Sequence, residues 1–236
     1  MSLRVTVIAV LAIALAVSLG RWQTRRADSK IALQEHLLDA QSGIALPIDA
    51  AVPDPAALIW HRVAISGSWM AADVVYLDNR PEGDRVGFYV IMPMKIPSGA
   101  VVLVNRGWLP RDARDRTLIP PYDTPAGTVD VTGVAMPDEA RFLDLGSVTP
   151  KLGTVWENFS YDNFHAASGL SPVRVVVRQD NRTLDGLSRE WPDRGAILQG
   201  EIDRHHGYVF QWYAMAAAIA GLLIYWGIKR GRGANV

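Results

Sequence analysis

Two apolar stretches without a single charged residue stand near the opposite ends of this 236-residue chain, at residues 5–20 and 209–228. A helix needs roughly 20 predominantly apolar residues to cross the hydrocarbon core of a bilayer. The second stretch reaches that length directly. The first reaches it when flanking residues are counted and Arg4 and Arg21 extend their charged heads outward. We therefore predict two transmembrane helices that flank one extramembrane domain.

The first stretch has an alternative interpretation as the apolar part of a cleaved signal peptide, with a basic start at residues 1–4 and cleavage near residues 16–18. Small residues at a spacing of four favour a retained helix instead, because small faces let two membrane helices approach closely. Such residues are Ala12, Ala16 and Gly20 in the first stretch, and Ala214 and Ala218 in the second. Alanine is also common in membrane helices without any such role.

The charges around the second stretch predict its orientation. Residues 229–236 hold three basic side chains and no acidic one, so the positive-inside rule places them in the cytoplasm. Two spans then place residues 1–4 in the cytoplasm and residues 21–208 outside it. The four basic side chains within residues 21–30 favour the opposite insertion of the first helix, so the two signals conflict.

The absence of a long Arg- and Ser-rich presequence favours a bacterial inner membrane, with a multi-pass protein whose main domain is periplasmic.

The composition excludes several classes of function. Lys and Arg number 24, and Asp and Glu also number 24, so no excess positive charge remains to neutralise nucleic-acid phosphates. The chain has no cysteine. It therefore holds no disulfide, no thiolate nucleophile, no cysteine-ligated zinc or iron–sulfur cluster, no covalently attached c-type heme and no thiolate site for copper.

Between the two stretches, short β-type runs alternate with turn residues, which predicts one mostly β (α+β) domain. The predicted strands are residues 60–69, 74–77, 87–94, 100–105, 128–135 and 173–178. Turns are predicted at residues 53–55, 81–84, 97–99 and 120–121. The predicted helices are residues 21–40, which continue the first span, and residues 161–168, with Gly169 at the end. Residues 180–194 are predicted to form a loop.

No catalytic motif emerges from the sequence: there is no G-x-S-x-G, no glycine-rich phosphate loop and no H-E-x-x-H. Two Asn-Arg pairs, Asn79-Arg80 and Asn105-Arg106, each follow a β-type run. One interpretation is a turn with a surface arginine. The other is that Arg80 and Arg106 pair with buried carboxylates, which suit the planar guanidinium group.

His205 and His206 stand directly before the second stretch. In a helix, His205, Tyr208 and Trp212 share one face, so an imidazole lies beside aromatic rings at the edge of the membrane. This arrangement suits a flat, hydrophobic, metal-containing ligand, and neutral imidazole is a common axial ligand of heme iron. Several arginines at the same level suit heme propionates: Arg21, Arg25, Arg26 and Arg204. An interfacial histidine pair that binds no ligand is the other interpretation.

Nearly the whole chain resembles the surfeit-locus-one family, the membrane-anchored assembly factors of heme–copper terminal oxidases. Four motifs carry the resemblance. They are Gly20-Arg21-Trp22-Gln23 followed by Arg26 and Lys30; Asn79-Arg80 followed by Gly87-Phe88-Tyr89-Val90 and Pro93; Val102-Leu103-Val104-Asn105-Arg106-Gly107-Trp108; and Arg204-His205-His206-Gly207-Tyr208 followed by Gln211-Trp212. The third is the most specific.

The resemblance implies a non-enzymatic role in the maturation of cytochrome c oxidase. Bacterial members of the family are associated with the binding of heme a and its provision to the large catalytic subunit. The implied partners are subunit I of cytochrome c oxidase, the heme a synthesis machinery and the lipid bilayer. The family's histidine falls on His205, which the resemblance makes the ligand of the heme iron, whereas His206 has no counterpart. Trp22, Arg21 and Arg26 are added on physical grounds, as neighbours from the first helix.

Two other hypotheses stay open. The first is a heme-free membrane scaffold that stabilises oxidase subunits and uses residues 79–80 and 105–108 as its interaction surface. The second is a membrane-anchored periplasmic enzyme, although the sequence contains no pattern of nucleophile, base or metal ligands that supports it.

Overall fold

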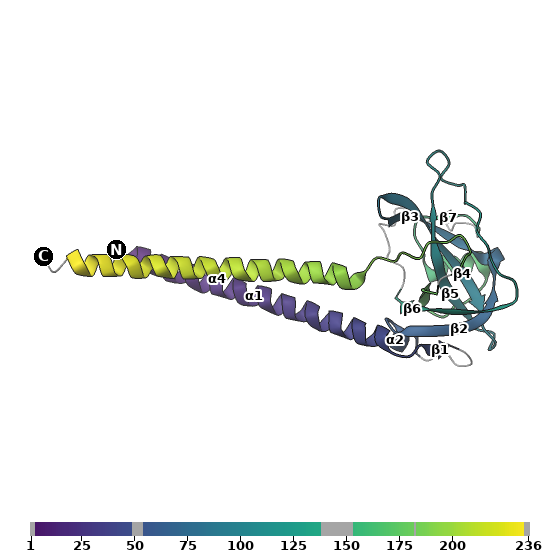
Figure 1. The fold of residues 1–236 in the computed structure, drawn as a ribbon, viewed down its shortest axis with the longest axis horizontal. Helices are drawn as coiled ribbons and strands as arrows, with labels where there is room; N and C mark the ends of the chain where they lie inside the picture. Colours follow the sequence, from purple (N-terminus) through teal and green to yellow (C-terminus); the bar gives the residue numbers. More distant parts are fainter. Residues whose placement is uncertain (1–2, 49–53, 138–152, 182, 234–236) are drawn as a thin grey trace. The chain divides into compact units, whose positions relative to one another are not determined.

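The computed structural model describes residues 3–48, 54–137, 153–181 and 183–233, and the chain divides into two compact units (Figure 1). The helical unit comprises Met1–Leu38 and Asp193–Val236, and the sheet unit comprises Asp39–Pro192. Parts of the two predicted cytoplasmic ends, residues 1–2 and 234–236, lie outside the described residues.

Two 40-residue helices form the helical unit, α1 (Leu3–Ser42) and α4 (Arg194–Gly233). Both are long and apolar enough to cross a membrane, so the predicted class of two candidate spanning helices around a mostly β domain is confirmed. At 1.5 Å per residue each helix is about 60 Å long, roughly twice the thickness of the hydrocarbon core. Each helix therefore extends well beyond its apolar stretch.

The two extensions were predictable to different degrees. The continuation of α1 through residues 21–40 is confirmed. The early start of α4 at Arg194 is not predicted by the sequence pattern. It follows from Asp193, whose carboxylate accepts a hydrogen bond of 3.1 Å from the Ala196 N–H and so caps the first turn.

Five strands of the sheet unit close on themselves. The ring runs through β2 (Arg62–Trp69), β6 (Thr128–Met136), β8 (Val176–Gln179), β5 (Val101–Pro110) and β4 (Arg85–Lys95), and β4 returns to β2. The β5–β8 pair is parallel and the other four pairs are antiparallel. Because a closed ring leaves no free edge between these strands, it protects the sheet from edge-to-edge pairing with other chains.

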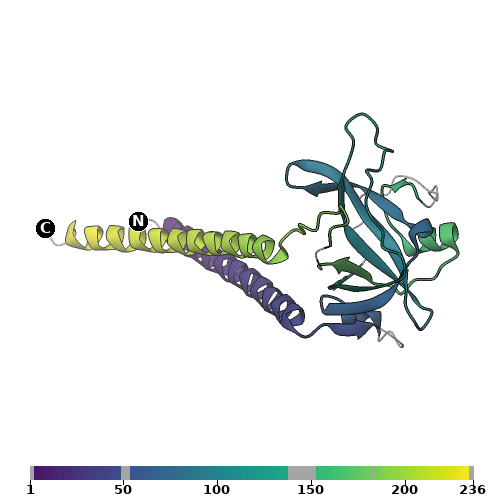
Figure 2. The same ribbon diagram turned by 45° about the vertical axis from the view of Figure 1, so that its right-hand side comes forward.

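The remaining short elements add to this ring (Figure 2). Strand β3 (Val75–Glu82) pairs with β4 and with β7 (Val155–Trp156), and β1 (Leu46–Ile48) pairs with β2. The short helices are α2 (Pro55–Leu58), the 3-10 turn η1 (Ala71–Asp73) and α3 (Tyr161–Ser168). Helix α3 is confirmed at its predicted bounds: Ser160 caps its start and Gly169, at φ 73°, ends it.

Alternating apolar side chains of the ring form the main core. They include Val63 and Ile65 of β2, Met94 of β4, Val102 and Val104 of β5, Val131 and Ala135 of β6, and Val177 of β8. A second cluster packs Phe159 and Phe164, which flank or belong to α3, against Ile91, Leu103 and Val176. The alternation predicted from the sequence thus places one set of side chains inside the ring and the other beneath α3.

Two of the predicted strand ends are wrong. The sequence predicts ends at residues 77 and 105, but β3 continues to Glu82 and β5 to Pro110. Both strands pass their Asn-Arg pairs through a β-bulge, an extra residue that bends a strand without ending it. In β3, Asn79 takes the left-handed conformation at φ 60°, which asparagine tolerates.

The bulge in β5 explains why glycine follows Arg106. Gly107 has a φ of 151°, and a Cβ at this position would lie 2.6 Å from the Ser188 carbonyl oxygen. The space left by glycine lets residue 188 pair with the next residue of β5. The Trp108 N–H donates to the Ser188 carbonyl at 2.7 Å, and the Ser188 N–H donates back at 3.0 Å.

Arg106 is itself 1% exposed and makes an ion pair of 3.1 Å with Asp185, which confirms the buried-carboxylate hypothesis for this arginine. Its guanidinium also donates to the Thr124 hydroxyl at 2.7 Å and to the Asp123 carbonyl at 2.8 Å. Burial alone would raise the pKa of Asp185, but hydrogen bonding and attraction from Arg189 hold it below its usual value. The carboxylate therefore stays ionised beside Arg106.

Replacing Arg106 with alanine should destabilise the sheet unit by about 3–5 kcal/mol, because loss of one partner leaves buried polar groups without compensation. The measurement is urea unfolding of the full chain in detergent, followed by tryptophan fluorescence. Arg174→Ala is the matched control, since Arg174 pairs with Asp162 at 3.5 Å and both side chains are largely exposed. Equal unfolding midpoints for the two variants would contradict a structural role for Arg106.

Candidate functional site

Helices α1 and α4 lie side by side in the helical unit and contact each other in antiparallel order (Figures 1 and 2). The Lys30 ammonium lies 2.6 Å from the Glu201 carboxylate. One turn further along α1, the Gln34 amide donates a hydrogen bond of 3.3 Å to the Gly195 carbonyl. A later residue of α1 thus meets an earlier residue of α4, which sets the register of the two helices.

Gly20 allows the close approach on the other side of this polar segment. A Cβ at residue 20 would lie 3.0 Å from the ring of Tyr213, so the aromatic ring rests directly on the glycine backbone. The Thr24 hydroxyl, one turn away, donates to the Gly20 carbonyl at 3.1 Å and uses its polar group within α1. The small residue predicted at position 20 therefore serves helix contact.

Between these two contacts, the imidazole of His205 meets the side-chain amide of Gln23. The Nδ1 of His205 lies 2.7 Å from the Oε1 of Gln23, and both side chains are half-buried. A hydrogen bond from Nδ1–H to this amide oxygen corresponds to the neutral tautomer of His205 whose Nε2 has the lone pair. The His205 side chain consequently faces the neighbouring helix, α1.

The other predicted site residues lie on the same two helices as Gln23 and His205. The guanidinium of Arg26 lies 5.8 Å from the ring centroid of Trp22, and Trp22 is 49% exposed. Tyr208 is also 49% exposed, and Trp212 is half-buried. Arg21 and His206 are exposed. The structure thus joins His205 to α1 and Arg26 to Trp22, and it leaves Tyr208 and Trp22 as exposed aromatic surface.

The number of ligand residues limits which metal species fits this site. Across residues 3–48, 54–137, 153–181 and 183–233, no three His, Asp or Glu side chains converge on a point. A structural zinc ion takes four protein ligands, which this arrangement does not provide. A metal that brings its own equatorial ligands, as a porphyrin does for iron, needs only one or two protein ligands. One imidazole, that of His205, fits that requirement.

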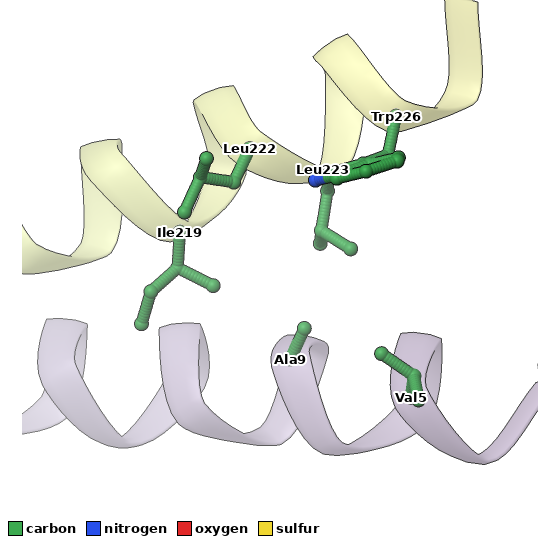
Figure 3. A pocket seen from close by; sticks show the side chains of 6 residues that line it. All are labelled: Val5, Ala9, Ile219, Leu222, Leu223 and Trp226. Atoms are coloured by element: carbon green, nitrogen blue, oxygen red, sulfur yellow. The ribbon is translucent and has the colours of Figure 1, made fainter. Parts of the chain in front are cut away.

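A cavity of about 350 Å³ lies between the helices at another level (Figure 3). All of its lining residues are apolar: Val5 and Ala9 of α1, and Ile219, Leu222, Leu223 and Trp226 of α4. Such a lining offers dispersion contacts, with the Trp226 indole N–H as the one hydrogen-bonding side-chain group among the lining residues, so it fits hydrocarbon chains of the bilayer.

Comparison with known proteins agrees with the motifs. The model of the SURF1 family matches residues 10–217. The chain belongs to the SURF1 family. The SURF1-like protein of Rickettsia bellii is 24% identical, over 86% of this chain and 82% of its own length. The SURF1-like protein of Monosiga brevicollis is 27% identical, over 92% and 84%, and Surfeit locus protein 1 of Rattus norvegicus is 24% identical, over 89% and 71%.

Sequence reasoning predicted His205 as a site residue of this SURF1 family member, and it did not identify Gln23 as the residue opposite the imidazole. Gln23 belongs to the first motif, yet no pattern in the sequence states which residue of one helix meets which residue of the other. Its position within three residues of Gly20, the small residue that permits close contact, is the available signal.

The helix register has a direct test in this chain, because it has no cysteine of its own. Thiols introduced by Lys30→Cys and Glu201→Cys should be joined efficiently by a short bifunctional thiol reagent, as the two native side chains touch. Lys30→Cys with Asp203→Cys is the control, because Asp203 is exposed on another face of α4. Adding Gly20→Leu should reduce cross-linking of the first pair. Equal cross-linking of both pairs would contradict this register.

Proposed function

We propose that this protein is an assembly factor for heme–copper terminal oxidases, and that it holds heme a at His205 before the heme enters the catalytic subunit of cytochrome c oxidase. Membership of the SURF1 family supports a role in oxidase assembly. The supporting observation from the structure is the contact between His205 Nδ1 and Gln23 Oε1, because an imidazole that donates from Nδ1 binds metals through Nε2.

In this proposal each predicted residue has one task. His205 would hold a bound heme through its imidazole, and the heme would supply the iron to which that imidazole binds. Trp22, Tyr208 and Trp212 offer aromatic surface to the edge or face of the ring. Arg21 and Arg26 neutralise carboxylates at the edge of the ring through charge-assisted hydrogen bonds. A single protein ligand suits delivery, because release then requires the loss of one bond.

The proposed setting is a bacterial inner membrane. The apolar parts of α1 and α4 cross the bilayer, both chain ends lie in the cytoplasm, and the sheet unit lies in the periplasm. The proposed partners are subunit I of cytochrome c oxidase and the machinery that synthesises heme a. Nothing in this role requires turnover chemistry, so we propose a chaperone-like carrier and not an enzyme.

The hypothesis of a heme-free scaffold predicted an interaction surface at residues 79–80 and 105–108, and most of these residues are buried. Arg80, Asn105, Arg106 and Trp108 are each at most 4% exposed, and the Trp108 indole donates to the Arg80 carbonyl at 2.8 Å. Asn79 is the exposed member of the two motifs. The four buried residues therefore stabilise the sheet unit and present almost no side-chain surface to another protein.

The heme proposal predicts a spectrum. Protein purified in detergent from a host that makes heme a should carry a Soret band, and His205→Ala should remove most of it because the iron loses its axial ligand. His206→Ala is the matched control and should keep the band, since His206 is exposed and makes no part of the contact with Gln23. Colourless wild-type protein from that host would favour a scaffold. Equal loss in both variants would contradict the assignment of His205.

The proposed topology predicts the location of two reporters. An enzyme reporter fused after Val236 should be active in the cytoplasm, and one inserted at Asp123 should be active in the outer compartment. The physical reason is the basic end of the chain, which resists translocation. Reversal of both results would mean that the basic residues 21–30 govern insertion.

A further inference from the structure

We infer that Gln23 is a positioning residue for His205: its side-chain oxygen holds the proton on Nδ1 and thereby keeps Nε2 free for a metal. The inference rests on the proposed function for its biological purpose, because it concerns the nitrogen that is to bind heme iron. The tautomer itself is a property of the protein without heme, so it is tested separately.

The contact is short and partly shielded from water. The 2.7 Å separation of Nδ1 and Oε1 is at the short end of the range for an N–H···O bond, and both side chains are half-buried. The two residues stand on different helices and are separated by 182 positions in the chain. The bond is therefore a consequence of helix pairing and not of local backbone geometry.

Contacts on both sides hold Gln23 opposite His205. On one side Tyr213 rests against Gly20, and on the other Lys30 pairs with Glu201. Neither helix can slide by one turn without breaking both contacts. A rise of about 5.4 Å per turn would also carry the amide out of reach of the imidazole. The register of the helices thus fixes the partner of His205.

A neutral imidazole without such a partner distributes its proton between the two nitrogens, and only the unprotonated one binds a metal. Metal-binding histidines in general donate their other ring N–H to a carboxylate, a carbonyl oxygen or water, which fixes the ring and makes it a better ligand. The amide oxygen of Gln23 takes this role at Nδ1 of His205. Loss of such partners typically weakens metal binding about 10- to 100-fold.

The chain offers a matched control for Gln23. Gln34 lies on the same helix, is also half-buried and also donates across to α4, but its partner is the Gly195 carbonyl and not an imidazole. Gln34→Ala therefore removes an amide that bridges the helices and leaves His205 untouched. Gln23→Glu is the conservative variant, because a carboxylate oxygen accepts the same hydrogen bond more strongly.

The first experiment uses the full chain without heme. Protein labelled with 15N-histidine in detergent micelles reports the protonated nitrogen of each of its five histidines by NMR, and His205→Ala assigns the signals of His205. We expect His205 to carry its proton on Nδ1 in the wild type, in Gln34→Ala and in Gln23→Glu. Gln23→Ala should give a mixture of both tautomers. A mixture in the wild type, or an unchanged tautomer in Gln23→Ala, would overturn the inference whether or not heme binds.

The second experiment titrates reduced hemin into the same proteins and records the Soret band and the iron–histidine stretching frequency. We expect Gln23→Ala to bind hemin about 10-fold more weakly than the wild type, and Gln34→Ala to bind it equally well. Gln23→Glu should bind hemin with a raised iron–histidine frequency, because a stronger acceptor makes the imidazole more electron-rich. Equal affinities and frequencies in all proteins would overturn the role toward the metal. Failure of the wild type to bind either hemin or heme a, with the tautomer result intact, would overturn the proposed function alone.

Discussion

A guanidinium group buried in an apolar core must find hydrogen-bond partners, and this requirement organises the sheet unit. Arg106 finds them in the segment around Asp123 and in the segment that carries Asp185, and neither segment belongs to a strand. Its guanidinium also lies 4.8 Å from the ring centroid of Trp69, at the end of β2. One side chain thus joins the ring of strands to two long connections whose backbone pairing alone would hold them weakly.

The elements with strong periodic signals were predictable, and those that depend on distant contacts were not. The two apolar stretches, helix α3 and the alternating strands β2, β4 and β6 follow from local patterns. The true ends of β3 and β5 do not, because asparagine, glycine and arginine are ordinary turn residues unless a bulge and a buried ion pair use them. Asp185, the carboxylate that pairs with Arg106 in the buried interior, stands 79 positions away from it in the chain.

The candidate site divides in the same way. His205 and its aromatic neighbours are visible in the sequence because three- and four-residue steps define one face of a helix. Gln23 is invisible as a partner, because only the register of two helices brings it opposite the imidazole. The register in turn depends on the lack of a side chain in Gly20, which admits the Tyr213 ring, and on the ion pair Lys30–Glu201. Sequence spacing does not show that Gly20 contacts Tyr213 or that Lys30 pairs with Glu201.

The 182 positions between Gln23 and His205 also delay the formation of their contact during protein synthesis. A ribosome adding about 5–20 residues per second needs roughly ten to forty seconds to travel from the first of these residues to the second. During that interval α1 has been synthesised and α4 has not, so the Gln23 amide cannot contact the His205 imidazole. A polypeptide that ends before residue 205 therefore carries only one member of the Gln23–His205 pair, and the contact between the two helices forms only after most of α4 has been synthesised.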